Sequence, residues 1–443
     1  MIHKNKRLYI CLLIILALTF HIQGVSVAAD SSNGKQNANK VSQPLKLSLE
    51  DAIKKGVESS SQLTSMDISI KKMWRVTDED KSFKELTSVT QKDLDNIDEY
   101  YNLVEKKNLY DNLTVFEEEQ VLKYKEEYGD IPSPFSRQNL LESYLNGRAF
   151  SKYSSWLQVL NLKDAYDTNK AKLEGDIQAM YYNLLYDIEL YEALENSLDT
   201  MEKQYPGMVL KYKKGLISEL DKYKFEVELS KKRLQLNKNK RGKEYQELLF
   251  KQVCGIERSQ AIELTGRDAG LSKEYKLDTY KNYCDKALLN RSEVVNAKLQ
   301  LEVYKQELEY YDKYIKQPYA FARTNLQQQL EDAEFAVTQK ILDVTGDIQT
   351  AYTDAKSVQS QMEIQKRNAQ SKISDYDIAE KKYSQGLISL VDLWNARDAA
   401  SSAEIEYKKA QRDTSYSFYR LEELTCKLGP GYKVNGAVIV PLE

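Results

Sequence analysis

Apolar residues recur every three or four positions over two long stretches of the chain, which predicts long amphipathic helices. The first stretch runs from Leu173 to Tyr205. In the second, from Leu393 to Leu428, apolar or small residues, among them Thr414 and Ser417, recur in alternating steps of three and four without a break. Such an alternation has a period of 3.5 residues, which is typical of a coiled-coil seam. We therefore predict an all-α fold of long antiparallel helical hairpins.

The sequence repeats itself at a fixed distance. The segment YKKGLIS at 212–218 returns as YSQGLIS at 383–389, and GDIQ at 175–178 returns at 346–349. Both pairs are 171 residues apart. Two separate matches at one offset predict a tandem duplication.

The two repeats differ in length. Residues 56–63 resemble 287–294 at an offset of 231, so the first repeat holds about 60 additional residues. These fall at about 85–150, a stretch rich in Glu, Lys and Asp that reads as helix and loop. We expect a first repeat at 47–270 with this insertion, a second repeat at 271–430 and a C-terminal tail at 431–443.

Each GLIS segment separates two predicted helices and carries the residues that end one helix and begin the next. The Gly can adopt the positive φ of a helix C-terminus, the Ser is a natural N-cap, and the Asp three residues later completes a capping box. These residues are Gly215, Ser218 and Asp221 in the first copy and Gly386, Ser389 and Asp392 in the second.

Capping does not explain the two adjacent apolar residues in each turn. They are Leu216 and Ile217 in the first copy and Leu387 and Ile388 in the second. Apolar residues at a hairpin tip suggest a docking surface. A turn with a purely structural role is the alternative.

The N-terminus has the pattern of an export signal. Lys4, Lys6 and Arg7 precede an apolar run at 8–20, and small residues at 27–29 offer a cleavage site. We expect a signal peptide at 1–29 and a flexible linker at 30–46. The alternative is an uncleaved anchor, but the apolar run is shorter than the ~20 residues of a membrane span.

The composition excludes several classes of chemistry. The two histidines, His3 and His21, lie in the predicted signal, so the mature chain has no histidine for a catalytic triad or a His-containing zinc site. Without the signal the chain has 61 basic and 67 acidic residues, a net charge of −6, which disfavours nucleic acid as a partner. We expect no enzymatic activity, metal or cofactor.

Three cysteines remain after removal of the signal: Cys254, Cys284 and Cys426. Their odd number and wide spacing are not those of a disulfide framework. We expect small buried residues near helix ends, with a Cys254–Cys426 bridge as the alternative.

The duplicated motif Tyr-x-x-Gly-Leu-Ile-Ser-x-x-Asp resembles the TolC-type outer-membrane efflux proteins. The segments LSLEDA at 47–52 and YRLEEL at 419–424 support the resemblance, which covers about 47–82 and 160–430. It implies a homotrimer with a barrel in the outer membrane and a helical tunnel in the periplasm. In this family the hairpin tips receive a periplasmic adaptor, a membrane-fusion protein that links the tunnel to an inner-membrane pump.

The resemblance also implies roles for individual residues. Asn395 stands where the family often has a second acid at the tunnel entrance, and Ile388 where some members have an Arg that ties the entrance shut. The adaptor-docking tips would be Gly215, Leu216, Ile217, Ser218, Gly386, Leu387, Ile388 and Ser389. The tunnel entrance would be formed by Asp221, Tyr383, Asp392 and Asn395.

The chain departs from the family where the barrel strands belong. In the second repeat that place is 312–330, which is too short for two strands of ~10 residues and a loop. The insertion at 85–150 lacks the alternation of a lipid-facing strand. We therefore expect a TolC-like helical trunk with little or no β-barrel.

Two functions fit these observations. The first is a non-enzymatic conduit subunit of an efflux or export system in the cell envelope. By resemblance it would lie in the outer membrane and periplasm, or in the cell wall or at the surface of a host without an outer membrane. The alternative is an exported coiled-coil scaffold or cell-surface protein without a transport role.

Overall fold

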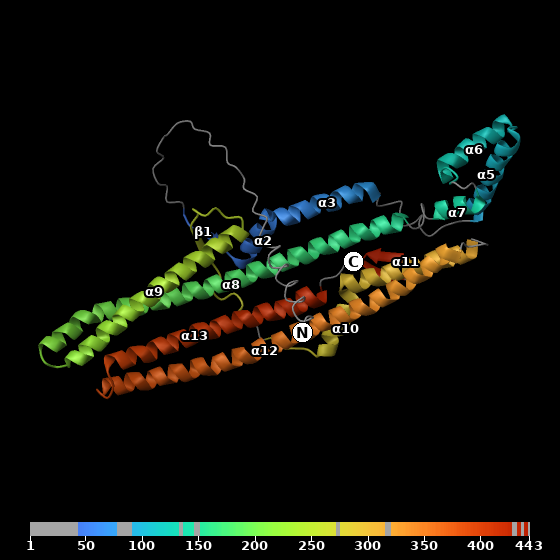
Figure 1. Cartoon of the computed structure of the whole chain (residues 1–443). Helices are drawn as coiled ribbons and strands as arrows, with labels where there is room; N and C mark the ends of the chain where they lie inside the picture. The colour runs from blue at the N-terminus through green and yellow to red at the C-terminus, as the bar shows by residue number, and fades with distance from the viewer. Residues whose placement is uncertain are drawn as a thin grey trace, which may run out of the picture. The chain divides into compact units, whose positions relative to one another are not determined.

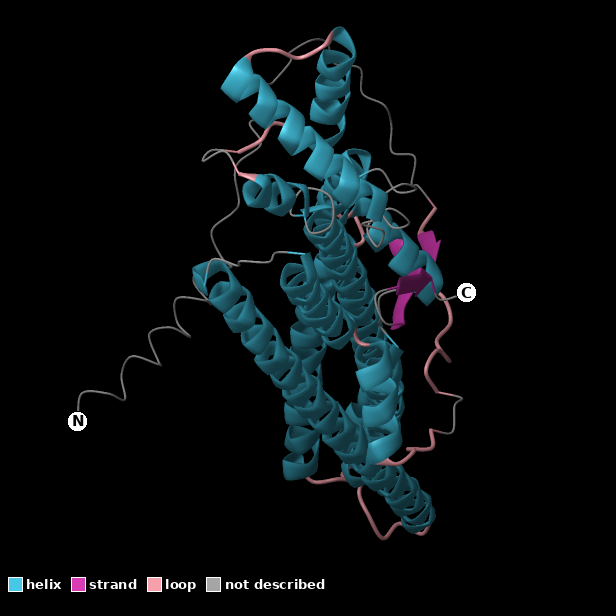
Figure 2. Ribbon diagram, turned by 90° about the vertical axis from the view of Figure 1, so that its right-hand side faces the viewer, coloured by secondary structure: helices cyan, strands magenta, loops and turns pink. Residues whose placement is uncertain are grey.

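A computed structural model describes residues 43–77, 91–132, 136–145, 151–271, 275–314, 320–427, 432–435 and 438–441. The predicted signal peptide and most of the predicted linker lie outside these residues. Helices make up most of the described chain (Figure 2). In this part of the chain, no helix combines the length and the apolar character that crossing a bilayer requires.

Four long helices form two antiparallel hairpins (Figure 1). The first consists of α8 (Ser151–Lys213) and α9 (Glu219–Val253), and the second of α12 (Ala320–Ser384) and α13 (Leu390–Tyr419). Helix α8 also packs against α13, so the two hairpins lie side by side. The predicted all-α fold of long helical hairpins is confirmed.

Helix α13 is buried on two faces. The predicted seam is one of them, because its members Ala400, Ala403, Ala410 and Thr414 are buried. The seam continues into the π-helical segment η2 (Arg420–Lys427). The small seam residues permit close packing against α12, while other buried residues of α13 face α8.

Corresponding helices of the two repeats begin or end 171 or 231 residues apart, which are the two offsets found in the sequence. The ends of α8 and α12 are 171 residues apart, and so are the starts of α9 and α13. Helices α2 (Leu49–Ser59) and α10 (Tyr280–Asn290) each have 11 residues and begin 231 residues apart. The helices that follow them, α3 (Ser61–Thr77) and α11 (Ser292–Tyr314), begin at the same offset.

The described part of the insertion, which the sequence indicated to be helix and loop, contains three helices: α5 (Gln91–Tyr110), α6 (Val115–Tyr128) and α7 (Arg137–Leu145). Its core is rich in tyrosine and extends to Tyr311 of α11 and Leu326 of α12. The insertion therefore packs near the start of α12, at the end of that helix away from its hairpin turn. Residues 315–319, within the stretch examined for barrel strands, lie outside the described residues.

Two short strand pairs complete the fold. Strand β1 (Leu45–Leu47) pairs in parallel with β2 (Ile262–Leu264), so the last residues of the predicted linker belong to a strand. Strands β3 (Tyr432–Asn435) and β4 (Val438–Pro441) form an antiparallel pair in the predicted tail.

The cysteines that the structure describes are free and buried. Cys254 is the C-cap of α9, and Cys284 lies in α10. Burial raises the pKa of the Cys254 thiol to about 11, so it stays protonated at neutral pH. The side chain of Cys426, the third cysteine, lies outside the described residues.

Candidate docking site at the hairpin tips

Both hairpin turns end their first helix in the same way. In the first turn, Gly215 has a φ of 69°, its N–H donates to the Tyr212 carbonyl at 2.9 Å, and the N–H of Leu216 donates to the Lys211 carbonyl at 2.9 Å. These two bonds define a Schellman motif. The second turn has a φ of 73° at Gly386 and the equivalent bonds at 2.9 and 2.8 Å.

Both turns also begin their second helix in the same way. Ser218 Oγ accepts a hydrogen bond from the Asp221 N–H at 3.1 Å, and Asp221 Oδ2 accepts one from the Ser218 N–H at 3.3 Å. Ser389 and Asp392 repeat these bonds, at 3.1 Å each. The predicted capping boxes are therefore confirmed. The bonds from Ser218 hold the pKa of Asp221 below its usual value.

In each turn, the leucine of the apolar pair is exposed to solvent and the isoleucine is half-buried. Leu216 is 68% exposed and Leu387 is 67% exposed. Ile217 is half-buried against a cluster that includes Phe225 and Trp394, and Ile388 is half-buried too. The exposed surface of the two turns therefore includes the leucines, whereas the isoleucines are half-buried.

The four residues expected at a tunnel entrance lie near the two turns in different settings. Asp221 and Asp392 are exposed and belong to the capping boxes. Tyr383 is half-buried in the last turn of α12, and Asn395 is exposed on α13. Their role at an entrance remains a prediction.

A groove lies between the two hairpins, beside their tips. It measures about 390 Å³, and residues of α8, α12 and α13 line it. Its lining includes Gly207, Met208, Lys211, Tyr383, Trp394 and Arg397. We call it the tip groove. Of these, only Tyr383 was singled out from the sequence, because a groove between two hairpins has no local sequence signature.

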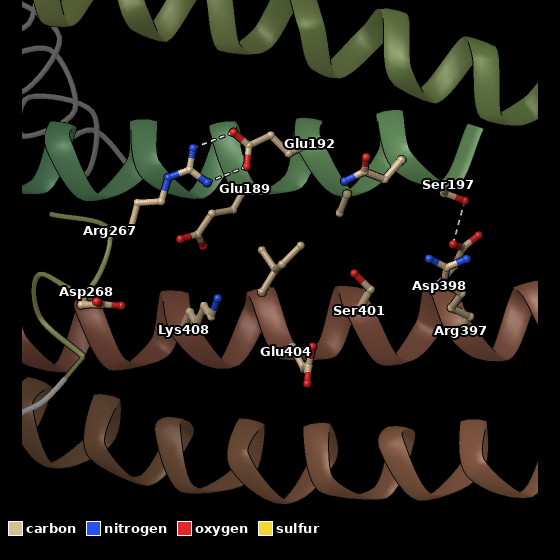
Figure 3. A pocket seen from close by; sticks show the side chains of 13 residues that line it. Glu189, Glu192, Ser197, Arg267, Asp268, Arg397, Asp398, Ser401, Glu404 and Lys408 are labelled. Carbon is tan, nitrogen blue, oxygen red and sulfur yellow. Dashed lines mark hydrogen bonds and ion pairs between the residues drawn. The ribbon is translucent and has the colours of Figure 1, made fainter. Parts of the chain in front are cut away.

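Further from the tips, a polar cleft of about 450 Å³ separates α8 from α13 (Figure 3). Arg267 donates to both carboxylate oxygens of Glu192, at 2.6 and 2.7 Å. Ser197 Oγ donates to Asp398 Oδ1 at 2.8 Å, and Lys232 Nζ lies 2.6 Å from Asp398 Oδ2. The contacts of Asp398 with Ser197 and Lys232 thus join the two hairpins along this cleft.

Arg412 of α13 joins three parts of the fold. Its guanidinium donates to the two carboxylate oxygens of Glu189 in α8, at 2.7 and 3.2 Å, and to the backbone carbonyl of Arg267 at 2.8 Å. Its side chain is fully buried, and that of Glu189 is 9% exposed. This buried ion pair fixes α13 against α8, and the bond to the Arg267 carbonyl fixes α13 against the segment that follows β2.

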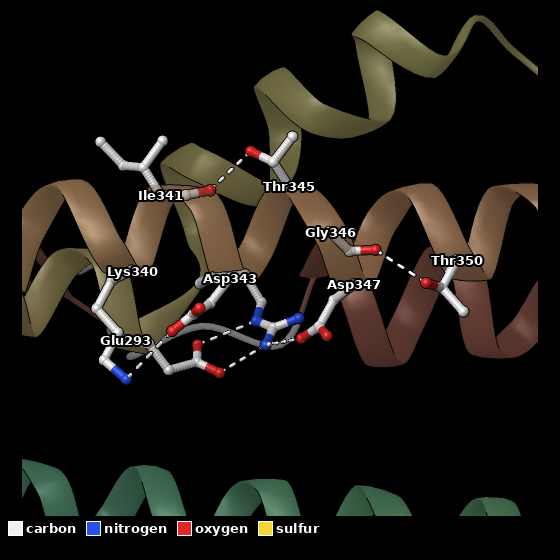
Figure 4. A network of polar contacts seen from close by, with 9 residues as sticks. Glu293, Lys340, Ile341, Asp343, Thr345, Gly346, Asp347 and Thr350 are labelled. Carbon is white, nitrogen blue, oxygen red and sulfur yellow. Dashed lines mark hydrogen bonds and ion pairs between the residues drawn. The ribbon is translucent and has the colours of Figure 1, made fainter. Parts of the chain in front are cut away.

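A second polar network fixes the α10–α11 turn on α12 (Figure 4). Arg291 Nη2 donates to Glu293 at 2.6 Å and to Asp347 at 3.2 Å. On α12 itself, Lys340 Nζ lies 3.7 Å from Asp343. This network positions α11, which in turn faces α8 across a third pocket.

Asp164 of α8 lies in that third pocket, where Asn296 of α11 donates to its carboxylate at 2.5 Å. Burial raises its pKa to about 6 from 3.8. Because the pKa of Asp164 is higher in the folded state than in the unfolded state, ionisation of Asp164 lowers the free energy of unfolding. This loss of stability grows as the pH rises from about 4 to 6.

Asp164→Asn is therefore expected to be more stable than the wild type at pH 7.5, with the advantage disappearing near pH 4. Urea unfolding at both pH values, followed by circular dichroism, measures this difference. Asp95→Asn, at an exposed position of α5, is the control. A variant that is less stable than the wild type at pH 7.5 would contradict the prediction.

The chain is similar to known proteins in part of its sequence and in its fold. The family model described as outer membrane efflux protein matches residues 322–426, which contain the second hairpin turn. Among proteins of curated function, none matches the chain. The resemblance to TolC-type outer-membrane efflux proteins that the tip motif indicated is confirmed.

Three solved channels share the fold at low sequence identity. The outer membrane channel CmeC of Campylobacter jejuni is 13% identical, with a TM-score of 0.53 over 92% of this chain and 95% of that one. The outer-membrane channel OprN is 11% identical, with a TM-score of 0.54 over 86% and 90%. CusC is 12% identical, with a TM-score of 0.54 over 92% and 100%.

Proposed function

We propose that this chain, which has the helical fold of outer-membrane efflux channels, is a non-enzymatic conduit subunit that docks a membrane-fusion adaptor through its hairpin tips. One observation carries the proposal. Two turns 171 residues apart have the same Schellman motif and capping box, and each presents an exposed leucine at the same position. A rigid turn with an exposed apolar residue is suited to a partner, because it binds without ordering a loop.

The subunit is proposed to act as a homotrimer that works with an inner-membrane pump in the cell envelope. Most of the large apolar residues exposed on α9 and α12 lie along one face of each helix, at helical spacing. They are Leu220, Tyr223, Leu234 and Tyr245 on α9, and Phe335, Leu342, Ile364 and Ile378 on α12. Neighbouring copies of the chain would cover these faces. In a host without an outer membrane, the same trimer would lie in the cell wall or at the surface.

The tip leucines provide the test. Leu216→Ser combined with Leu387→Ser is expected to weaken adaptor binding at least about tenfold, because burying an exposed leucine side chain in an interface is worth about 1.5–3 kcal/mol. Folding and trimer formation should be unchanged, since both side chains point to solvent. The measurement is binding to the purified adaptor of the same genome, together with light scattering for the mass.

Leu289→Ser serves as the control, because Leu289 is 75% exposed on α10. It should leave adaptor binding unchanged. If the double tip variant binds the adaptor as the wild type does, the docking role is wrong. A monomer that binds no adaptor would favour the exported scaffold.

A further inference from the structure

The turn between α5 and α6, in the insertion, carries an apolar surface that the proposed function does not use (Figure 1). Leu109, Tyr110, Val115 and Phe116 are each at least 66% exposed. They flank the four turn residues at 111–114. We call these four side chains the insertion tip. Large apolar side chains gathered on an exposed turn mark a contact surface.

Hydrogen bonds hold this turn at both ends. The Asp111 N–H donates to the Lys107 carbonyl at 3.0 Å, and Asp111 has a φ of 45°. Thr114 caps α6, because its N–H donates to Glu117 Oε2 at 2.7 Å and its Oγ1 accepts from the Glu117 N–H at 3.3 Å. Lys106 of α5 pairs with Glu117 at 2.7 Å and joins the two helices. The backbone therefore presents the insertion tip in a fixed arrangement.

The insertion tip is too small for a stable protein interface. A large aromatic side chain buries roughly 150–250 Å². Four side chains that are about two-thirds exposed therefore offer on the order of 500 Å². A second copy of the chain or another stable protein partner would need about 800 Å². A lipid surface needs less, because interfacial binding grows with whatever apolar area is buried, and tyrosine is enriched where lipid meets water.

The charges beside the insertion tip favour a lipid surface without net charge. Within residues 107–119, all of which the structure describes, the exposed charged side chains are Lys107, Asp111, Glu118 and Glu119. Anionic lipids attract clusters of lysine and arginine, and this turn has an excess of carboxylates instead.

We propose that the insertion tip inserts shallowly into a zwitterionic phospholipid surface and anchors the end of the molecule away from the hairpin turns. The core of the insertion includes Leu326 of α12, which lies ~87 Å from Ser384 at the rise of a helix. A membrane at the insertion tip and a partner at the hairpin turns would therefore not compete for space. This inference goes beyond the docking function and does not depend on it.

Binding to phosphatidylcholine vesicles tests the contact. Residues 30–443 are used, because the apolar run of the predicted signal would itself bind lipid. Leu109→Ser combined with Phe116→Ser is expected to lower partitioning into the vesicles at least about tenfold, since both side chains supply buried apolar area. Ile68→Ser combined with Leu289→Ser is the matched control. These two side chains are also exposed, but they lie on α3 and α10, so partitioning should stay unchanged.

Vesicles that contain phosphatidylglycerol test the chemistry. Partitioning into pure phosphatidylcholine should not depend on salt, because salt screens charged contacts and not apolar ones. It should fall when phosphatidylglycerol is added, and Asp111→Asn should reverse part of this fall. Asparagine tolerates the φ of this position. Binding that grows with phosphatidylglycerol and disappears at high salt would contradict the proposal, because lysines elsewhere in the chain would then be responsible.

Fluorescence locates the contact on the chain. The emission that Phe116→Trp adds to that of the wild type should be quenched by brominated phosphatidylcholine. The emission added by Leu289→Trp should not be quenched. Circular dichroism of each variant verifies that it is folded.

The proposal is wrong if the wild-type chain does not bind phosphatidylcholine vesicles, or if the insertion-tip variant binds them as its control does. A loss of mass in light scattering, with unchanged vesicle binding, would identify a second copy as the occupant instead. The docking function is tested separately. Leu216→Ser combined with Leu387→Ser should leave vesicle binding unchanged, and the insertion-tip variant should leave adaptor binding unchanged.

Discussion

Arg412→Ala is expected to lower the free energy of unfolding by about 3–5 kcal/mol, the cost of breaking a buried ion pair. The substitution leaves the carboxylate of Glu189 with little exposure and without its cation. It also removes the bond to the backbone carbonyl of Arg267. Urea unfolding at neutral pH, followed by circular dichroism, measures the change.

Two further variants test whether the burial of the ion pair causes this loss of stability. Arg233→Ala breaks an exposed pair with Glu202, whose closest approach is 2.8 Å, and should cost less than about 1 kcal/mol. Arg412→Met combined with Glu189→Leu removes both buried charges and should restore most of the stability. The interpretation is wrong if Arg412→Ala costs no more than Arg233→Ala.

Phe225→Ala is expected to destabilise the protein by about 3–5 kcal/mol, because it opens a cavity where the hairpins meet. The Phe225 side chain is fully buried, with its ring stacked on Tyr205 at 5.6 Å and 4.8 Å from the ring of Trp394. Since Trp394 belongs to the other hairpin, the variant should also weaken adaptor docking.

Phe116→Ala is the control for this truncation. Phe116 is 67% exposed on α6, so its loss should change the stability by less than about 0.5 kcal/mol. Both variants are compared by urea unfolding and adaptor binding. Equal stabilities of the two variants would show that the cluster around Phe225 is not the core that the structure indicates.

The hairpin tips were predictable because their signals are local. A glycine that ends a helix and a Ser-x-x-Asp that begins the next specify the turn within a few residues. The sequence could not separate Leu216 from Ile217, since both are apolar. Whether each of these side chains points to solvent or into the core depends on where the second hairpin lies.

The tip groove and the Arg412–Glu189 pair depend on contacts between distant residues. Arg412 and Glu189 are 223 residues apart, and each is one of many charged residues on its helix. The strand pair β1–β2 was missed for the same reason, because each strand has three residues and its partner lies in another part of the chain.

The matched helix ends place the two hairpin turns at equivalent positions of the two repeats. A partner that contacts both turns therefore requires hairpins of equal length. Seven residues added to each arm of one hairpin would advance its tip by about 10 Å and leave the side-chain faces in register. Leu216 and Leu387 would then stand at different heights, and a single partner could no longer touch both. Hairpin tips that bind one partner can therefore be moved only when both repeats lengthen together.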